Sequence, residues 1–241
     1  MQGPGPGGRV VRTMDYTPVN GQTLKDFYGY RLYDTIRFVA GTAVSTAIFS
    51  FFQIPLGGQT AGQNFATQYT KTKIDTNLGS AGLLSKGRYF EVHSMQVRAL
   101  MTGATDTTYG SSGINTQLPT NALGAAVISA TNEAAEILEQ GYMSFIMDDK
   151  TYEEGKLIHF PTPYGLSGFA GSGSPGGSGA GTDTIAVVNN GFGRPYRLPI
   201  PRQIDGLRSF RVDMQFPGGF TPNRNFKIEV CLEGGLYRPV V

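Results

Sequence analysis

The stretch that most restricts how this chain can fold is residues 208–241, RSFRVDMQFPGGFTPNRNFKIEVCLEGGLYRPVV, where apolar and polar side chains alternate in two runs. A period of two places every second side chain on the same face of a β-strand. The sequence between the runs is rich in Gly, Pro and Asn, which is typical of a loop. The stretch therefore predicts two half-buried strands that lie in one sheet. The side chains predicted to be buried are Phe210, Val212, Met214, Phe226, Ile228 and Val230.

The composition extends this prediction to the whole chain. Among 241 residues there are 34 Gly and 14 Pro, and only 16% of the residues are charged. Such a composition suits short strands and many loops, whereas long surface helices need Glu, Lys and Arg. The length is sufficient for one large β-domain or two small ones. We therefore predict an all-β protein with roughly ten to twelve strands.

Charge and cysteine content exclude two broad classes of protein. The net charge of +2 offers no general electrostatic basis for binding nucleic acid. The single cysteine, Cys231, cannot form an intrachain disulfide, so a disulfide-stapled secreted module is excluded. The Gly/Pro-rich start does not look like a signal peptide. The most apolar stretch, residues 38–56, contains internal Gly, Ser and Thr and is predicted to be buried strand rather than a membrane helix.

Four segments depart from simple strand patterns. Residues 1–30 begin with GPGPGG and are expected to form a flexible arm that becomes ordered on a neighbour. The strong strand pattern of residues 89–101 changes phase, which predicts a β-bulge near Ser94. Residues 132–140, NEAAEILEQ, predict a short helix. The Gly/Ser-rich residues 167–182 predict an exposed loop away from contacts between subunits.

Patterns that could indicate a cofactor or metal site are weak in this chain. The GxGxxG match at Gly171, Gly173 and Gly176 lacks the preceding strand and following helix that a dinucleotide site requires. His93 and His159 lie within strand patterns and have no metal-ligand spacing. We therefore predict neither a cofactor nor a bound metal.

Patterns that could indicate catalysis are equally weak. A cluster of acids is interleaved with lysines, so a solvated turn is favoured over an acid–base pair or a calcium site. Its members are Asp148, Asp149, Glu153 and Glu154. Because the nucleophile pattern GxSxG is also absent from the sequence, we predict that the protein is not an enzyme.

Arginines form the strongest candidate contact residues. Arg194, Arg197 and Arg202 lie in one strand-like stretch, and Arg9 and Arg12 lie in the predicted arm. A guanidinium fork binds carboxylate or phosphate well. These residues are therefore candidates for contacts with neighbouring subunits or with the interior of an assembly. The alternative is that they are solvated charges at the edge of a strand.

Three phrases resemble the major capsid proteins of tailless icosahedral bacteriophages that are built from a double jelly roll. The phrases are FFQIPLGGQ at 51–59, KTKIDTNLGSAGLLSKGRYFEVHSMQV at 71–97 and FKIEVCLEGGLYRPVV at 226–241. The resemblance implies a jelly-roll sandwich with two small jelly rolls in tandem, at residues 31–148 and 149–241, after the arm at 1–30. One jelly roll with long inserted loops stays open, because two rolls leave only about fifteen residues for each strand and its loop.

The resemblance also implies a structural role. The chain would assemble through its loops and its arm into an icosahedral viral shell in the host cytoplasm and then form part of the virion. Its partners would be further copies of itself, as a homotrimer, and other capsid proteins. The arm would contact an internal membrane or the genome, and no small-molecule substrate is expected.

Two other functions remain open at this point. One is a β-rich adhesion or glycan-binding fibre module that uses tyrosine-rich loops around Tyr69, Tyr109 and Tyr164. The other is a jelly-roll hydrolase, which would need a pair of carboxylates in a groove.

Overall fold

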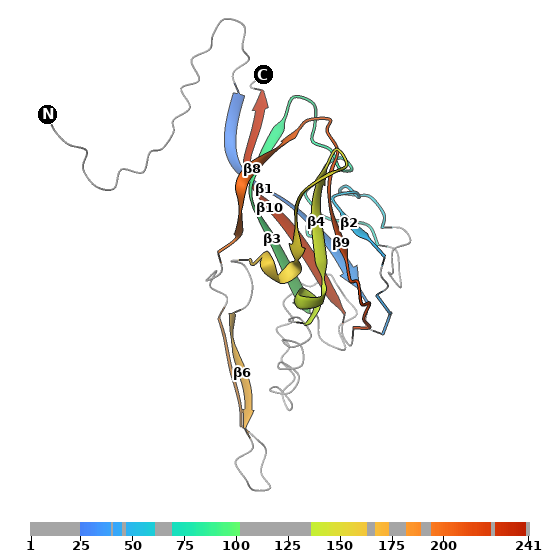
Figure 1. Ribbon diagram of the computed structural model, residues 1–241, viewed down its shortest axis with the longest axis vertical. Coiled ribbons are helices and arrows are strands. Elements are labelled where there is room, and N and C mark those ends of the chain that lie inside the picture. The colour runs from blue at the N-terminus through green and yellow to red at the C-terminus, as the bar shows by residue number, and fades with distance from the viewer. Residues whose placement is uncertain are drawn as a thin grey trace, which may run out of the picture.

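The computed structural model describes residues 25–39, 41–44, 47–60, 69–101, 136–162, 167–173, 182–188, 194–222 and 225–239. Within these residues the protein is all-β, and two antiparallel four-stranded sheets face each other as a β-sandwich (Figure 1). The first sheet contains, in spatial order, β1 (Lys25–Phe38), β10 (Phe226–Pro239), β3 (Tyr89–Met101) and β8 (Tyr196–Asp205). The second sheet contains β2 (Phe49–Phe51), β9 (Phe210–Gln215), β4 (Tyr142–Met147) and β5 (Lys150–Lys156). A short 3-10 helix, η1 (Leu157–His159), follows β5.

The core lies between the two sheets and is formed by the alternating apolar side chains of their strands. All six side chains predicted to be buried from the alternation in residues 208–241 are at most 1% exposed. Aromatic rings fill much of this space; for example, the rings of Phe38 and Phe226 stack at 4.5 Å. Full burial of one such side chain contributes about 2 kcal/mol. The period-two pattern therefore identified the core side of these strands correctly.

The prediction that these two strands share a sheet is wrong. β9 lies in the second sheet and β10 in the first, so their buried faces oppose each other across the core. The reason lies in the connecting residues, which do not form a tight hairpin. Phe216 is 1% exposed and its ring lies 4.8 Å from that of Phe220, which in turn packs on Phe226. The connection is thus an apolar bridge from one sheet to the other.

Strands from both sides of residue 148 share both sheets. β10 pairs with β1 and β3, and β9 pairs with β2 and β4. The expected division into separate rolls at residues 31–148 and 149–241 therefore does not agree with the strand pairing.

The start of β1 corrects the expected end of the arm. Residues 25–30 are not part of a free arm, because they pair in register with residues 234–239 of β10. Tyr30 also packs edge-on against Phe90 at 6.3 Å, which ties this part of the chain to the sheet. Residues 1–24, with Arg9 and Arg12, lie outside the described residues.

The predicted bulge is confirmed one residue from its expected place. β3 changes register between Val92 and Ser94 in its pairing with β8, and β10 changes register between Glu233 and Gly234 in its pairing with β3. His93 is therefore the extra residue, and the bulge reconciles the two apolar phases of β3.

The predictions of a helix at residues 132–140 and of a loop at residues 167–182 agree in part with the structure. The described part of the predicted helix, residues 136–140, is helical. The Gly/Ser-rich segment is not entirely a loop, because β6 (Ser167–Gly173) pairs with β7 (Thr182–Val188) as a two-stranded ribbon. Backbone pairing needs no large side chains, and β7 supplies β-branched residues. The tip between β6 and β7 lies outside the described residues.

Among the helical segments that are described, none combines the length and the apolar composition needed to cross a membrane.

The β4–β5 turn contains a strain that can be removed. Asp148 and Asp149 both have positive φ, at 46° and 62°, which defines a type I′ turn that favours glycine at its second position. We expect Asp149→Gly to raise the free energy of unfolding by about 0.5 to 1 kcal/mol. Urea titration measures this change. Asp149→Ala is the matched control: it removes the same carboxylate but keeps a Cβ, so a gain for Asp149→Ala as well would contradict the explanation by strain.

Candidate functional site

The candidate contact arginines Arg194, Arg197 and Arg202 lie at or next to β8, one of the two edge strands of the first sheet. Arg194 and Arg197 are exposed, whereas Arg202 is half-buried and its guanidinium lies 5.0 Å from the centroid of the Tyr152 ring. The structure therefore brings these three residues to one edge of the sandwich. It gives Arg202 a packing role that Arg194 and Arg197 do not share.

The middle of β8 stands away from its neighbour. Residues 202–205 pair with 89–92 of β3, and residues 196 and 197 pair with 95 and 94, so residues 198–201 oppose only His93. Pro199 and Pro201 have no N–H to donate to a ladder. Between them Ile200 is 61% exposed. We call Arg194, Arg197, Pro199, Ile200 and Pro201 the β8 surface.

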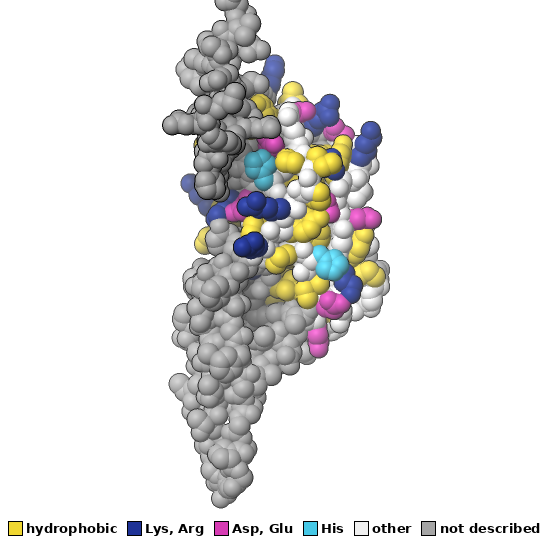
Figure 2. Space-filling model, turned by 60° about the vertical axis from the view of Figure 1, so that its left-hand side comes forward, with side chains coloured by type: hydrophobic (Ala, Val, Ile, Leu, Met, Phe, Trp, Pro, Cys, Tyr) yellow, Lys and Arg dark blue, Asp and Glu magenta, His cyan; other side chains and the backbone are white. Residues whose placement is uncertain are grey.

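The β8 surface rests on a rigid base. The Tyr196 hydroxyl donates a hydrogen bond to Glu153 at 2.8 Å, and the Tyr196 ring packs edge-on against Phe160 at 5.1 Å. Burial and the hydrogen bond to Glu153 raise the pKa of Tyr196, so its hydroxyl stays protonated as the donor. Figure 2 brings this side of the molecule forward and shows exposed apolar side chains in a band with basic side chains beside it. An apolar projection with flanking arginines suits contact with another protein.

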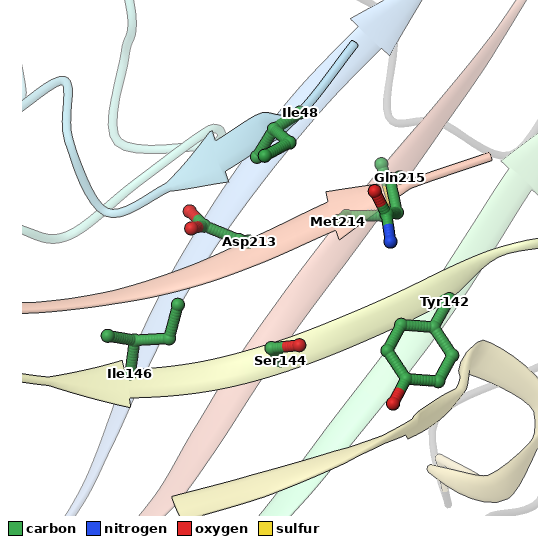
Figure 3. Close-up of a pocket in the computed structure, with 7 residues that line it drawn as sticks. All are labelled: Ile48, Tyr142, Ser144, Ile146, Asp213, Met214 and Gln215. Atoms are coloured by element: carbon green, nitrogen blue, oxygen red, sulfur yellow. The ribbon is translucent and has the colours of Figure 1, made fainter. Parts of the chain in front are cut away.

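A second candidate site, which the sequence did not predict, is a hollow on the outer face of the second sheet. It has a volume of about 160 Å³. Its lining residues come from β9, β4 and the start of β2 and are labelled in Figure 3: Ile48, Tyr142, Ser144, Ile146, Asp213, Met214 and Gln215. Only the register of three strands brings these positions together, so no spacing along the chain could have indicated the hollow.

The carboxylate in this hollow is held firmly. Asp213 Oδ1 accepts a hydrogen bond from the Ser50 hydroxyl at 2.6 Å, and Oδ2 accepts one from Arg211 Nε at 2.9 Å. The hydrogen bond to Asp213 raises the pKa of Arg211, so the guanidinium stays protonated as the donor. Burial, followed by the charge of Glu154, raises the pKa of Tyr142, so the hollow holds a neutral phenol beside a fixed carboxylate.

A buried ion pair lies at the other edge of the first sheet. Lys71 Nζ lies 2.5 Å from Asp34 Oδ1, and the two side chains are 2% and 0% exposed. Asp34 Oδ2 accepts a hydrogen bond from the backbone N–H of Phe52 at 2.6 Å, which holds Phe52 at a positive φ of 67°. Burial raises the pKa of Asp34, while the Lys71 ammonium lowers it. Because both side chains are buried, the pair belongs to the structure of the core.

The residues that follow Lys71 cover the free edge of β1. The Tyr33 N–H donates to Asn77 Oδ1 at 3.1 Å, and the Tyr33 carbonyl accepts from the Thr76 hydroxyl at 3.1 Å. Asn77 Nδ2 also donates to the Arg31 carbonyl at 2.6 Å. An uncovered edge would invite pairing with another chain. The sequence DTN at 75–77 therefore has a structural role, because it satisfies backbone groups at the edge of β1.

The remaining candidates are not brought together. Among the described residues, no group of three or more His, Cys, Asp or Glu side chains could hold a metal ion. His93 lies in the β3 bulge and His159 at the end of η1. Two acids of the predicted cluster face arginines: Asp148 lies 3.4 Å from Arg208, and Asp149 lies 3.4 Å from Arg211. Both pairs are exposed and screened by solvent.

Two further expectations concern single side chains. Cys231 falls at a polar position of the alternation in residues 226–233, which predicts an outward side chain, but it is buried, and burial raises the pKa of its thiol to about 12. Tyr69 is not a free loop side chain, because the Arg37 guanidinium lies 4.1 Å from the centroid of its ring. Tyr109 and Tyr164 lie outside the described residues.

No protein-family model matches this chain, and no curated protein or solved structure matches it either.

Proposed function

We propose that the sandwich is a single jelly roll with long inserted loops. Its eight strands, counted along the chain, lie in the order first, eighth, third and sixth in one sheet and second, seventh, fourth and fifth in the other. This order supports the proposal because it is obtained when a long ladder of four antiparallel strand pairs is rolled up. The pairs would be first with eighth, second with seventh, third with sixth and fourth with fifth. Each of these pairs is hydrogen-bonded.

The function that we propose is that of a capsid subunit that assembles with further copies of itself into a viral shell. Jelly rolls are used by viral capsid proteins, and also by lectins, so the fold by itself leaves both classes open. The observation that carries the proposal is the β8 surface, where Ile200 is exposed to solvent between Pro199 and Pro201, with Arg194 and Arg197 earlier in the same stretch. A partner that covers Ile200 and the two prolines would remove their apolar surface from water, which favours association.

The assembly that we propose is a trimer that packs into the shell with other capsid proteins. A cyclic trimer joins two different surfaces of the same subunit. The exposed acid Glu136 offers a counterpart for Arg194 or Arg197 of a neighbour. Residues 1–24, with Arg9 and Arg12, would face the shell interior and its membrane or genome. The protein would then reside in the virion.

The proposal predicts that one charge on the β8 surface abolishes assembly. The wild-type chain should be larger than a monomer by light scattering, and Ile200→Glu should be monomeric with an unchanged melting temperature, because burying the new charge costs several kcal/mol. Ile74→Glu is the matched control, since Ile74 is 56% exposed at the opposite edge of the same sheet. A wild-type chain that stays monomeric at high concentration and at every salt concentration would refute the proposal.

A further inference from the structure

The hollow on the outer face of the second sheet follows from the sizes of three neighbouring rows of side chains. Ser50, Asp213 and Ser144 lie directly opposite one another on β2, β9 and β4. Opposed side chains on one face of a sheet stand only about 5 Å apart. The two serines are small, so the middle row forms a low floor with the Asp213 carboxylate at its centre.

Larger side chains form the walls of the hollow. On one side Tyr142 stands opposite Gln215, with Ile48 next to them, and on the other side Ile146 stands opposite Arg211. Figure 3 shows Tyr142 and Gln215 together at one end and Ile146 at the other, with Ser144 and Asp213 between them. The hollow therefore combines a polar floor with walls that are aromatic and aliphatic.

This combination matches one class of small molecule. A pyranose ring has an apolar C–H face that packs on an aromatic ring, and a rim of hydroxyls that need acceptors and donors. Here Tyr142 offers the ring, while Asp213, Ser144 and Gln215 offer a carboxylate, a hydroxyl and an amide. A volume of about 160 Å³ is well below that of a site for a drug-sized ligand, so it suits one sugar residue.

We propose that this hollow binds one neutral hexopyranose residue of a glycan. The carboxylates of Asp213 and of Glu154, which lies opposite Ser144 on β5, outnumber the one guanidinium of Arg211 at the hollow, so a sugar acid would be repelled. Asp213 already accepts hydrogen bonds from Ser50 and Arg211, which fix the position of the carboxylate before the ligand arrives. This binding function is separate from the β8 surface and does not depend on assembly.

Ligand-observed NMR tests the proposal on the full-length chain. The probes are methyl α-glucopyranoside, methyl α-mannopyranoside and methyl α-galactopyranoside, with N-acetylneuraminic acid as the anionic probe. We expect at least one neutral glycoside to bind with a millimolar dissociation constant, as befits a shallow site for one sugar, and the anionic sugar not to bind. Binding by none of the three neutral glycosides, or by the anionic sugar alone, would overturn the proposal.

Two variants locate the binding. Tyr142→Ala removes the ring and should weaken binding by about tenfold. Ser144→Leu keeps the side chains of the walls but fills the floor, so it should abolish binding while the melting temperature stays close to that of the wild type. Tyr152→Ala is the matched control, since Tyr152 lies under Arg202 and away from the hollow. Binding that survives Ser144→Leu would place the sugar elsewhere and overturn the assignment.

The outcomes separate this inference from the proposed function. Loss of sugar binding in Ser144→Leu with assembly intact supports both. Sugar binding by a chain that never assembles supports the hollow and refutes the shell.

Discussion

Replacing Gly234 with alanine is expected to unfold the sandwich. A Cβ built on Gly234 would lie 1.7 Å from the carbonyl oxygen of Glu91 in the neighbouring strand β3. The obstacle is backbone in the ladder of the central strand, next to the β3 bulge, so no side-chain rotation can relieve it. We expect the free energy of unfolding to fall by more than about 4 kcal/mol, in the range of the most damaging single substitutions.

Gly29→Ala is the control for this prediction. Gly29 lies on β1 opposite Gly235, and a Cβ built on Gly29 meets no atom within 4 Å. Alanine there should be neutral or slightly stabilising, because it reduces the conformational entropy of the unfolded chain. Circular dichroism during guanidinium denaturation compares the two variants. Similar effects of Gly234→Ala and Gly29→Ala would show that the strands can move apart at the bulge.

Replacing Lys71 with methionine is the second substitution with a large expected effect. Methionine keeps most of the volume of the side chain but leaves the Asp34 carboxylate buried without its counter-ion. Breaking a buried ion pair from one side costs about 3 to 5 kcal/mol. Lys73→Met is the matched control, because Lys73 is exposed in the same segment, and this variant should unfold at the same denaturant concentration as the wild type.

A second substitution and a change of pH both test this explanation. Asn at position 34 is uncharged and can still accept the hydrogen bond from Phe52, so Asp34→Asn combined with Lys71→Met should regain most of the lost stability. In Lys71→Met alone, burial raises the pKa of Asp34 above its ordinary value. A buried acid with a raised pKa costs least when it is protonated, so the deficit of the variant should shrink as the pH falls toward about 4. A deficit that is independent of pH would point to lost packing instead.

The sequence predicted which side chains of the last two strands are buried, because a period of two is a local property. It did not predict which sheet each strand joins. That choice depends on Phe216 and Phe220, which turn the connection into a bridge across the core, although the residues around them look like an ordinary loop.

Asp34 shows a second limit of the local pattern. It lies on β1 opposite Val230, on the face that meets the core, where an apolar residue would be expected. Its partner Lys71 is 37 residues away along the chain, so no local signal could indicate the pair. The hollow could not be predicted for the same reason, since Ser144 and Ser50 form its floor only because both lie opposite Asp213 in the sheet. The β8 arginines were predicted from the sequence as contact residues, but the exposed Ile200 between the prolines was not.

The place of β10 in the first sheet has a consequence for how the protein is made in a cell. β10 lies between β1 and β3, so these two earlier strands have no shared partner until residues 226–239 have left the ribosome. Until then the apolar faces of β1 and β3 stay open, at a stage when nascent chains are prone to aggregate. A chain whose translation stops early cannot close this sheet. Synthesis of β10 thus acts as a checkpoint, because only chains that contain β10 can complete the first sheet.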